Sequence, residues 1–255
     1  MSALPQPPHW RDNRTAILLG LFLFGISGVA SIVLGIERVM RGSYLTACIL
    51  AGSAVFCACL TAACIRSVFA TVPLHATYDS NGTTLQPDPV TTTLALVSLF
   101  ALIPSGTLYV IYVPRGFVDL PLGRAEQIFS PILIGLGVAI AVWGLIAFAR
   151  RRTAGYVRLT PTGFELANLV LTQEGTWDDV VDITDEYPDR QARHHTVFVM
   201  TEGKPKVLKN TSGFVPSGAA LYWMIRHYWK HPESRAELTD GSAIERLRKE
   251  QFLAE

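Results

Sequence analysis

Four long stretches without an ionised side chain dominate this sequence. They run over Thr15–Ile36, Tyr44–Ile65, Thr91–Val113 and Ile128–Ala149. A helix needs about 20 apolar residues to cross the hydrocarbon core of a bilayer. We therefore expect a membrane domain over residues 1–152 with four transmembrane helices, and the lipid bilayer as its first partner. The absence of internal charges argues against a proton pump or an ion-coupled transporter, because intramembrane charges mark such pathways.

Arginines at the helix ends predict the orientation through the positive-inside rule. Four spans place both termini on one side. The side with the termini holds Arg11, Arg14, Arg66 and Arg150–Arg152, and the other side holds Arg38, Arg41, Arg115 and Arg124. The arginine run directly at the end of the fourth span is the strongest single indication. We expect a multi-pass protein of the cell membrane with both termini in the cytoplasm.

Small residues recur at every fourth position in three of the predicted spans. The rows are Ser27, Ser31 and Gly35; Ala54, Ala58 and Ala62; and Gly137 and Ala141. Such rows let helix backbones approach closely in lipid. Packing within the four-helix bundle is the interpretation we favour, and the alternative is a dimer face in a homo-oligomer.

The composition changes after Arg152. Up to this residue there are ten Lys+Arg and six Asp+Glu, a net charge of +4, whereas the remainder has twelve and fifteen, a net charge of −3. Short alternating segments replace the long apolar runs, with turns spaced roughly as in a small antiparallel barrel or sandwich. The predicted strands are Tyr156–Thr160, Phe164–Leu166, Leu169–Thr172, Trp177–Ile183, Thr196–Met200 and Lys206–Leu208. We expect the segment from Thr153 to Glu255 to fold without the membrane part.

Two helices are predicted after these strands. The first opens at Pro216 and carries one apolar face of Leu221, Ile225 and Tyr228. The second, about Ser242 to Phe252, belongs to a helical tail over residues 236–255.

This order of strands and helix resembles the bacterial pleckstrin-homology-like (PH-like) domain. The resemblance rests on the opening hairpin at Leu159–Phe164, on the step Trp177–Val180, and on the helix from Pro216 to Lys230. It covers about residues 153–235 and implies an α+β fold, a small β-barrel capped by a helix. The family usually has seven strands, so a seventh either lies near Gly213–Val215 or is absent. The whole arrangement is similar to transmembrane proteins of actinobacteria.

The resemblance raises lipid headgroups as a ligand, and the charges disfavour them. Phosphoinositide-binding members of the eukaryotic family use several basic residues around the first hairpin, where this chain offers only Arg158. The net negative charge of the domain also opposes an anionic leaflet. Four residues remain as candidates for contact with a partner, namely Trp177, Lys204, Lys206 and Lys209. For Trp177 we prefer a buried core anchor, and for the lysines a solvated turn.

No residue pattern indicates catalysis, a cofactor or a metal. Adjacent residues of a strand point to opposite faces, so His194 and His195 cannot serve one site. His227 and His231 have a spacing that can bind a metal on a helix, but no third ligand is evident. The four cysteines lie in one apolar stretch and are read as reduced thiols. The acidic run from Asp178 to Asp189 lacks the spacing of a calcium loop.

Protein interaction is the function that these sequence features leave open. We expect a non-enzymatic, membrane-anchored protein whose cytoplasmic PH-like domain mediates protein interaction or scaffolding within a larger membrane complex, without nucleic acid. The alternative is an accessory subunit for transport of a lipid or small molecule, with the helical bundle as the working part.

The segment 73–89 between the second and third spans predicts a further β-hairpin. Ala76–Leu85 aligns with Val157–Leu166, so that Gly82 falls on Gly163 and Leu85 on Leu166. A duplicated unit of two helices and a hairpin is one interpretation, and a chance likeness of two turns is the other. A lone hairpin is barely stable in water. Under the duplication this hairpin should therefore pack on the C-terminal domain along an open edge.

Overall fold

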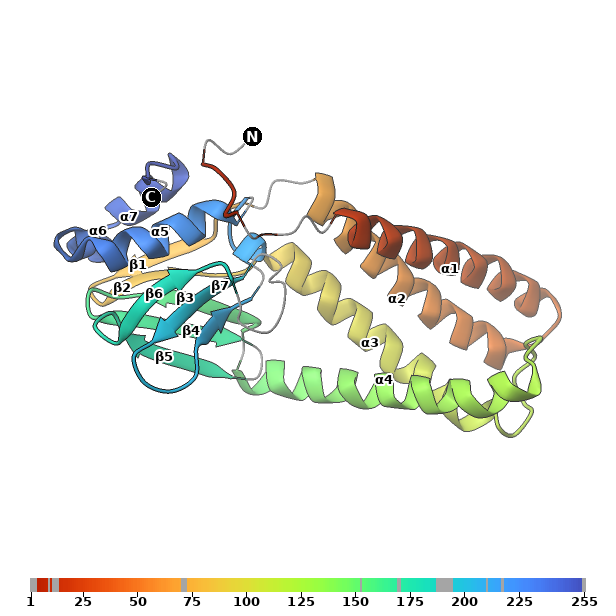
Figure 1. Cartoon of the computed structure of the whole chain (residues 1–255). Coiled ribbons are helices and arrows are strands. Elements are labelled where there is room, and N and C mark those ends of the chain that lie inside the picture. Colours follow the sequence, from red (N-terminus) through yellow and green to blue (C-terminus); the bar gives the residue numbers. More distant parts are fainter. Residues whose placement is uncertain are drawn as a thin grey trace. The chain divides into compact units, whose positions relative to one another are not determined.

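The computed structural model describes residues 4–8, 10, 14–69, 73–151, 153–168, 171–186, 195–209, 211–216 and 218–253. The chain forms two compact units, each assembled from separate segments (Figure 1). The helical unit comprises residues 14–70 and 90–152, and the β-unit comprises 1–13, 71–89 and 153–255. The β-unit is therefore larger than the predicted domain at residues 153–235, because it also contains the hairpin segment and the helical tail.

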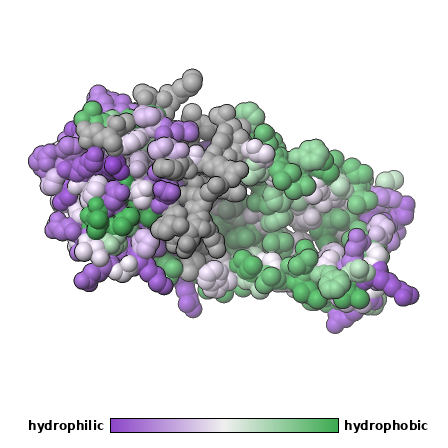
Figure 2. All heavy atoms as spheres, in the orientation of Figure 1, coloured by the Kyte–Doolittle hydropathy of each residue, from purple (hydrophilic) through white to green (hydrophobic). Residues whose placement is uncertain are grey.

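Four long helices make up the helical unit. They are α1 (Arg14–Met40), α2 (Tyr44–Phe69), α3 (Pro89–Tyr112) and α4 (Arg124–Arg151). All four are long and apolar enough to cross a membrane, as the sequence predicts. Large apolar side chains point outward, for example Phe22 and Leu133 with 64% and 69% of their surface exposed. On the face drawn in Figure 2, hydrophobic residues predominate on this unit except at one end, whereas hydrophilic residues predominate on the β-unit.

Small residues form the contact between α1 and α2. A Cβ atom added at Gly28 would lie 3.2 Å from the Cβ of Cys57, and the hydroxyls of Ser31 and Ser53 are 3.2 Å apart. Of the predicted row on α1, Ser31 is buried and Ser27 is exposed. The backbones approach closely because these side chains leave little between them.

An ion pair connects α1 to the segment between α3 and α4. The guanidinium of Arg38 contacts the carboxylate of Asp119, and the backbone N–H of Asp119 donates to the Thr46 hydroxyl at 3.0 Å. Arg38 is only 7% exposed. The three residues thus join α1, α2 and the α3–α4 connection at one end of the helical unit.

Two antiparallel sheets form the β-unit. The first has the strand order β1-β2-β3-β4-β5 and the second has the order β6-β7-β8. The strands are β1 (Ala76–Asp79), β2 (Gly82–Leu85), β3 (Gly155–Leu159), β4 (Gly163–Asn168), β5 (Thr172–Thr176), β6 (Val180–Thr184), β7 (Thr196–Met200) and β8 (Lys206–Leu208).

Five of the six strands predicted after Arg152 are present, one of them shifted. The third prediction is wrong, because Leu171 lies in the connection between β4 and β5, where its N–H donates to the Asn168 side chain at 2.7 Å. A strand over Thr172–Thr176 follows the predicted segment, of which Leu169 and Val170 lie outside the described residues. The fourth begins at Val180, after Trp177. Where a seventh strand was considered, the structure has a short 3-10 helix at Thr211–Gly213.

The predicted closed barrel is wrong for the described strands. No backbone ladder joins the described strands β8 and β5, and side chains connect them instead. The Val207 N–H donates to the Gln173 side chain at 3.1 Å, and the Lys206 ammonium donates to the Glu174 carbonyl. The two sheets therefore stay separate along this line.

The hairpin β1–β2 extends the first sheet at the edge of β3. Thr83 lies opposite Leu159 and Leu85 opposite Val157. The Thr83 hydroxyl also donates to the Leu238 carbonyl at 2.7 Å. Docking of this hairpin on an open edge is thus confirmed, whereas its origin by duplication stays a prediction.

The core lies between the sheets and the helices that follow them. These are α5 (Ala219–Lys230), η2 (Pro232–Ala236), α6 (Glu237–Asp240) and α7 (Ser242–Arg248). On α5 the predicted apolar face of Leu221, Ile225 and Tyr228 is fully buried. The tail adds Leu238, Leu247 and Phe252 to the same core, as do Leu4 and Trp10 from the N-terminal segment.

Candidate interaction surface

Trp177 lies in the core and anchors the step into β6. It is 2% exposed, and its indole N–H donates to the Thr160 carbonyl at 2.8 Å. The ring packs on Phe164, and the Arg235 guanidinium lies 5.4 Å from its centre. The preferred interpretation as a core anchor is confirmed, so this residue offers no surface to a partner.

The three candidate lysines do not act as one patch. Lys204 and Lys209 are exposed. Lys206 is half-buried, donates to the Glu174 carbonyl and lies 5.8 Å from the centre of the Phe164 ring. Its ammonium therefore connects the two sheets, and only two of the three lysines remain free for solvent.

A groove crosses the outer face of β6 and β7. Successive residues of a strand point to opposite faces, and Phe198 points inward, where it stacks on Phe164 at 4.1 Å between ring centres. Val197 and Val199 lie on the other face of the sheet, opposite Thr184 and Asp182 of β6. Val199 is half-buried there, whereas Val197 has no exposed surface. The groove has a volume of about 360 Å³ and is lined by Asp182, Thr184, Glu186, Val197, Val199, Met200, Gly203 and Pro205.

The floor and the rim of this groove differ in chemistry. Val199 and Met200 give the floor its partly exposed apolar surface, and Asp182 and Glu186 add carboxylates at the rim. Asp182 is about half exposed, with its nearest cation, Arg226, at 3.8 Å. Glu186 is exposed. An apolar floor beside two carboxylates suits a segment that combines an aliphatic with a basic side chain.

Side chains of α5 cover the edge of β6. Arg226 and Trp229 donate to the carbonyls of Ile183 and Val180 at 2.5 and 3.1 Å. These bonds satisfy backbone groups that an edge strand otherwise offers to another strand. These two carbonyls of β6 are therefore not free to pair with another strand.

Val197 and Val199 were not predicted as site residues, although the sequence contains a signal for a second apolar face of β7. Val197-Phe198-Val199-Met200 is apolar at four successive positions. A strand with one face in water alternates, whereas a continuous apolar run indicates a strand covered on both faces. The full burial of Val197 agrees with this signal.

The described members of the two histidine pairs contact other residues of the β-unit. His194 lies outside the described residues, and the carbonyl of His195 accepts a bond from the Trp10 indole at 3.0 Å. His227 contacts Arg246 of α7 at 3.4 Å, and His231 contacts Glu233 at 3.1 Å. Burial, then the charges of Arg246 and His231, lower the pKa of His227. Within the described residues, no three His, Cys, Asp or Glu side chains are grouped to hold a metal ion.

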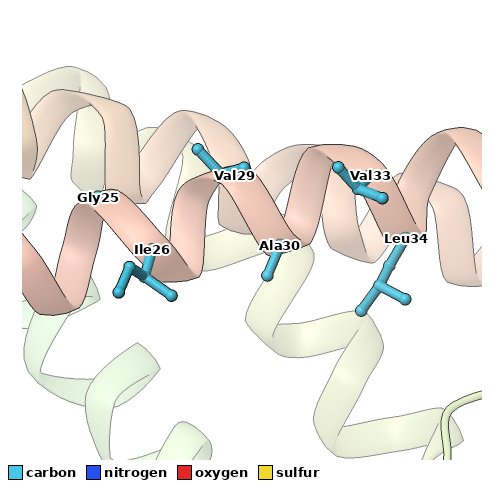
Figure 3. A pocket seen from close by; sticks show the side chains of 6 residues that line it. All are labelled: Gly25, Ile26, Val29, Ala30, Val33 and Leu34. Carbon is cyan, nitrogen blue, oxygen red and sulfur yellow. The ribbon is translucent and has the colours of Figure 1, made fainter.

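Two apolar hollows lie in the helical unit. One of about 460 Å³ runs between α1 and α2, where Ser31 is its polar lining residue, with Gly35, Ala47 and Ala58 along it. The other, of about 560 Å³, lies against α1 and is lined by Gly25, Ile26, Val29, Ala30, Val33 and Leu34 (Figure 3). Neither holds an ionisable group, so both suit hydrocarbon.

No known protein family, curated protein or solved structure shows a significant match to this chain. The class of this protein is therefore defined by its fold alone. It is a chain of four helices that can each span a membrane, joined to an antiparallel sheet unit that three separate segments build.

Proposed function

We propose that this chain is a non-enzymatic, multi-pass protein of the cell membrane whose β-unit binds a partner protein, as an interaction or scaffold domain of a larger membrane complex. The observation that carries the proposal is the groove on the outer face of β6 and β7, where the partly exposed Val199 and Met200 lie beside the carboxylates of Asp182 and Glu186.

The connectivity supports one aqueous side for the whole β-unit. Its three segments are separated from one another by α1 with α2 and by α3 with α4. A chain that crosses a bilayer twice returns to the side it left. The arginine run that ends α4 favours the cytoplasm for this side.

The order of elements supports a PH-like domain. Three strands of the first sheet and three of the second are followed by α5, which packs into the core. The hairpin β1–β2 adds two strands from a distant part of the chain. We therefore propose a PH-like fold whose first sheet is extended by an inserted hairpin.

The groove defines the kind of segment that the partner presents. Aliphatic side chains would replace water over Val199 and Met200, at about 25 cal/mol per Å² of apolar surface removed from water. A lysine or arginine beside them would meet Asp182 and Glu186. Such charges chiefly set orientation and the rate of association.

A lysine in the groove floor tests this function. The full chain, purified in a mild detergent, is used to capture partners, with Val199→Lys as the groove variant and Val181→Lys as its matched control. Val181 lies on β6, is 57% exposed and does not line the groove. We expect a partner that the wild-type chain and Val181→Lys retain and that Val199→Lys loses. Equal capture by both variants would remove the groove from the proposal.

A specific observation also favours the alternative, an accessory role in transport of a lipid or small molecule. The hollow between α1 and α2 is bordered by small residues and is apolar apart from Ser31. Ala58→Leu would fill it, and Ala139→Leu on the exposed face of α4 is the control. Mass spectrometry of copurified lipid decides: loss of a bound species in Ala58→Leu alone supports the alternative.

A further inference from the structure

A proline-rich segment at the N-terminal end of the β-unit packs on α5. Residues 4–8 read Leu-Pro-Gln-Pro-Pro and are followed by Trp10. Leu4, Pro7 and Trp10 are buried, whereas Pro5, Gln6 and Pro8 between them are exposed. The spacing of Leu4 and Pro7 matches a polyproline II helix, which has three residues per turn. Trp10 follows after a turn in which its N–H donates to the Pro7 carbonyl at 3.2 Å.

Aromatic side chains of α5 hold this segment. The indole N–H of Trp223 donates to the Pro5 carbonyl at 2.9 Å. Tyr222 lies edge-on between Trp223 and Trp10, with ring centres 5.0 and 6.0 Å away. All three rings belong to one buried cluster with Leu4.

This arrangement has the chemistry by which proteins recognise proline-rich ligands. Proline has no N–H, so such a segment offers its carbonyls and its ring surfaces. An aromatic-lined groove accepts the rings, and an indole N–H pairs with a carbonyl. The entropic cost is low because proline already restricts the backbone.

We propose that Tyr222 and Trp223 form a polyproline-binding site, that residues 4–8 occupy it as a tethered ligand, and that a proline-rich segment of a partner protein replaces them. The site is separate from the groove on β6 and β7 and shares no lining residue with it. A short tether supplies an effective concentration on the order of millimolar. Free ligand therefore competes poorly until the tethered segment is weakened or removed.

The test measures binding of a labelled peptide, Ala-Leu-Pro-Gln-Pro-Pro, by fluorescence anisotropy. The protein is the full chain in detergent micelles, compared with the same chain lacking residues 2–8. We expect the shortened chain to bind the peptide at least tenfold more tightly than the intact chain. A peptide with alanine in place of each proline should not bind.

Two tryptophan variants of the shortened chain identify the site. Trp223→Phe keeps an aromatic ring and removes the N–H that pairs with Pro5, so the affinity should fall roughly tenfold, as expected for loss of one hydrogen bond of about 1.4 kcal/mol. Trp229→Phe is the matched control, because that indole donates to the Val180 carbonyl on β6 and not to residues 4–8. Equal affinity of the two variants would overturn the proposal.

A third comparison tests the proposal even if the shortened chain does not fold. Pro5→Ala with Pro7→Ala in the intact chain weakens the tethered ligand without removing it. This double variant should bind the labelled peptide more tightly than the wild type does. If circular dichroism shows a folded protein and the affinity does not rise, residues 4–8 are a permanent part of the core and the proposal is wrong.

Discussion

Leu85 and Val157 lie opposite each other across β2 and β3, and neither side chain has any exposed surface. One residue precedes α3 and the other follows α4, so 71 residues of sequence separate two neighbours in the core. The β-unit therefore depends on a strand that lies between two membrane-spanning pairs of helices.

Removal of the Leu85 side chain should destabilise the β-unit. We expect Leu85→Ala to lower the free energy of unfolding by about 2–5 kcal/mol, because a buried leucine leaves a cavity. Tryptophan fluorescence during denaturation of the full chain in detergent measures this. Leu253→Ala is the control, since Leu253 is 67% exposed, and its effect should stay within about 0.5 kcal/mol. A small effect at Leu85 would show that the hairpin docks loosely.

The fragment from Thr153 to Glu255 should gain stability from the hairpin. Alone it leaves Val157 and the edge of β3 uncovered, whereas a fusion of residues 73–89 ahead of it restores β2. We expect the fusion to unfold cooperatively at a higher temperature than the fragment. Calorimetry of both soluble products measures the two unfolding temperatures. Equal temperatures would show that the fragment folds without the hairpin.

Disulfide formation should report the register of β2 on β3. Thr84 lies opposite Arg158, and opposed residues of antiparallel strands lie within the Cα separation that a disulfide needs. In a chain whose four cysteines are replaced by alanine, Thr84→Cys with Arg158→Cys should crosslink on mild oxidation. The pair Thr84→Cys with Tyr156→Cys is two residues out of register and should crosslink far more slowly.

The indole of Trp177 should be a main stabilising side chain of the β-unit. Trp177→Ala should cost about 3–5 kcal/mol, because it empties the core and leaves the Thr160 carbonyl without its donor. Trp143→Ala, a change on α4 at a residue 55% exposed, should leave the transition of the β-unit in place. A cost below about 1 kcal/mol would contradict the burial of Trp177.

The β-unit should lose stability below about pH 6.5 through His227. Burial and the charges of Arg246 and His231 lower the pKa of this residue in the fold, against the favourable charges of Glu237 and Glu233. A lowered pKa means that the unfolded chain binds the proton more readily. The stabilising contribution is therefore present above the ordinary value of 6.5 and decreases as the pH falls through the folded pKa. The free energy of unfolding, measured by denaturation between pH 5 and 8, should depend less on pH in His227→Asn than in the wild type.

Part of the candidate site was accessible from the sequence. Trp177 was predicted as a core anchor because an indole beside acidic residues at a strand start needs a buried hydrogen-bond partner. The groove was not predicted, because which face of β7 is outward depends on Phe198 stacking on Phe164 of the other sheet. Lys206 was grouped with Lys204 and Lys209 by proximity in sequence, and only the approach of β8 to β5 shows that it connects the sheets.

The sequence by itself determined the four helices, most strands of the C-terminal segment and the apolar face of α5. The length of an uncharged apolar run, the alternation of a strand and the period of an amphipathic helix are local properties. Each depends only on residues that are close in the sequence. The tertiary structure decided which segments form one unit. It placed Leu4, Leu85 and Phe252 in the same core, left the two sheets unclosed, and seated a proline-rich segment on Trp223. Such contacts depend on surfaces that exist only after distant strands and helices have packed, so no local pattern contains them.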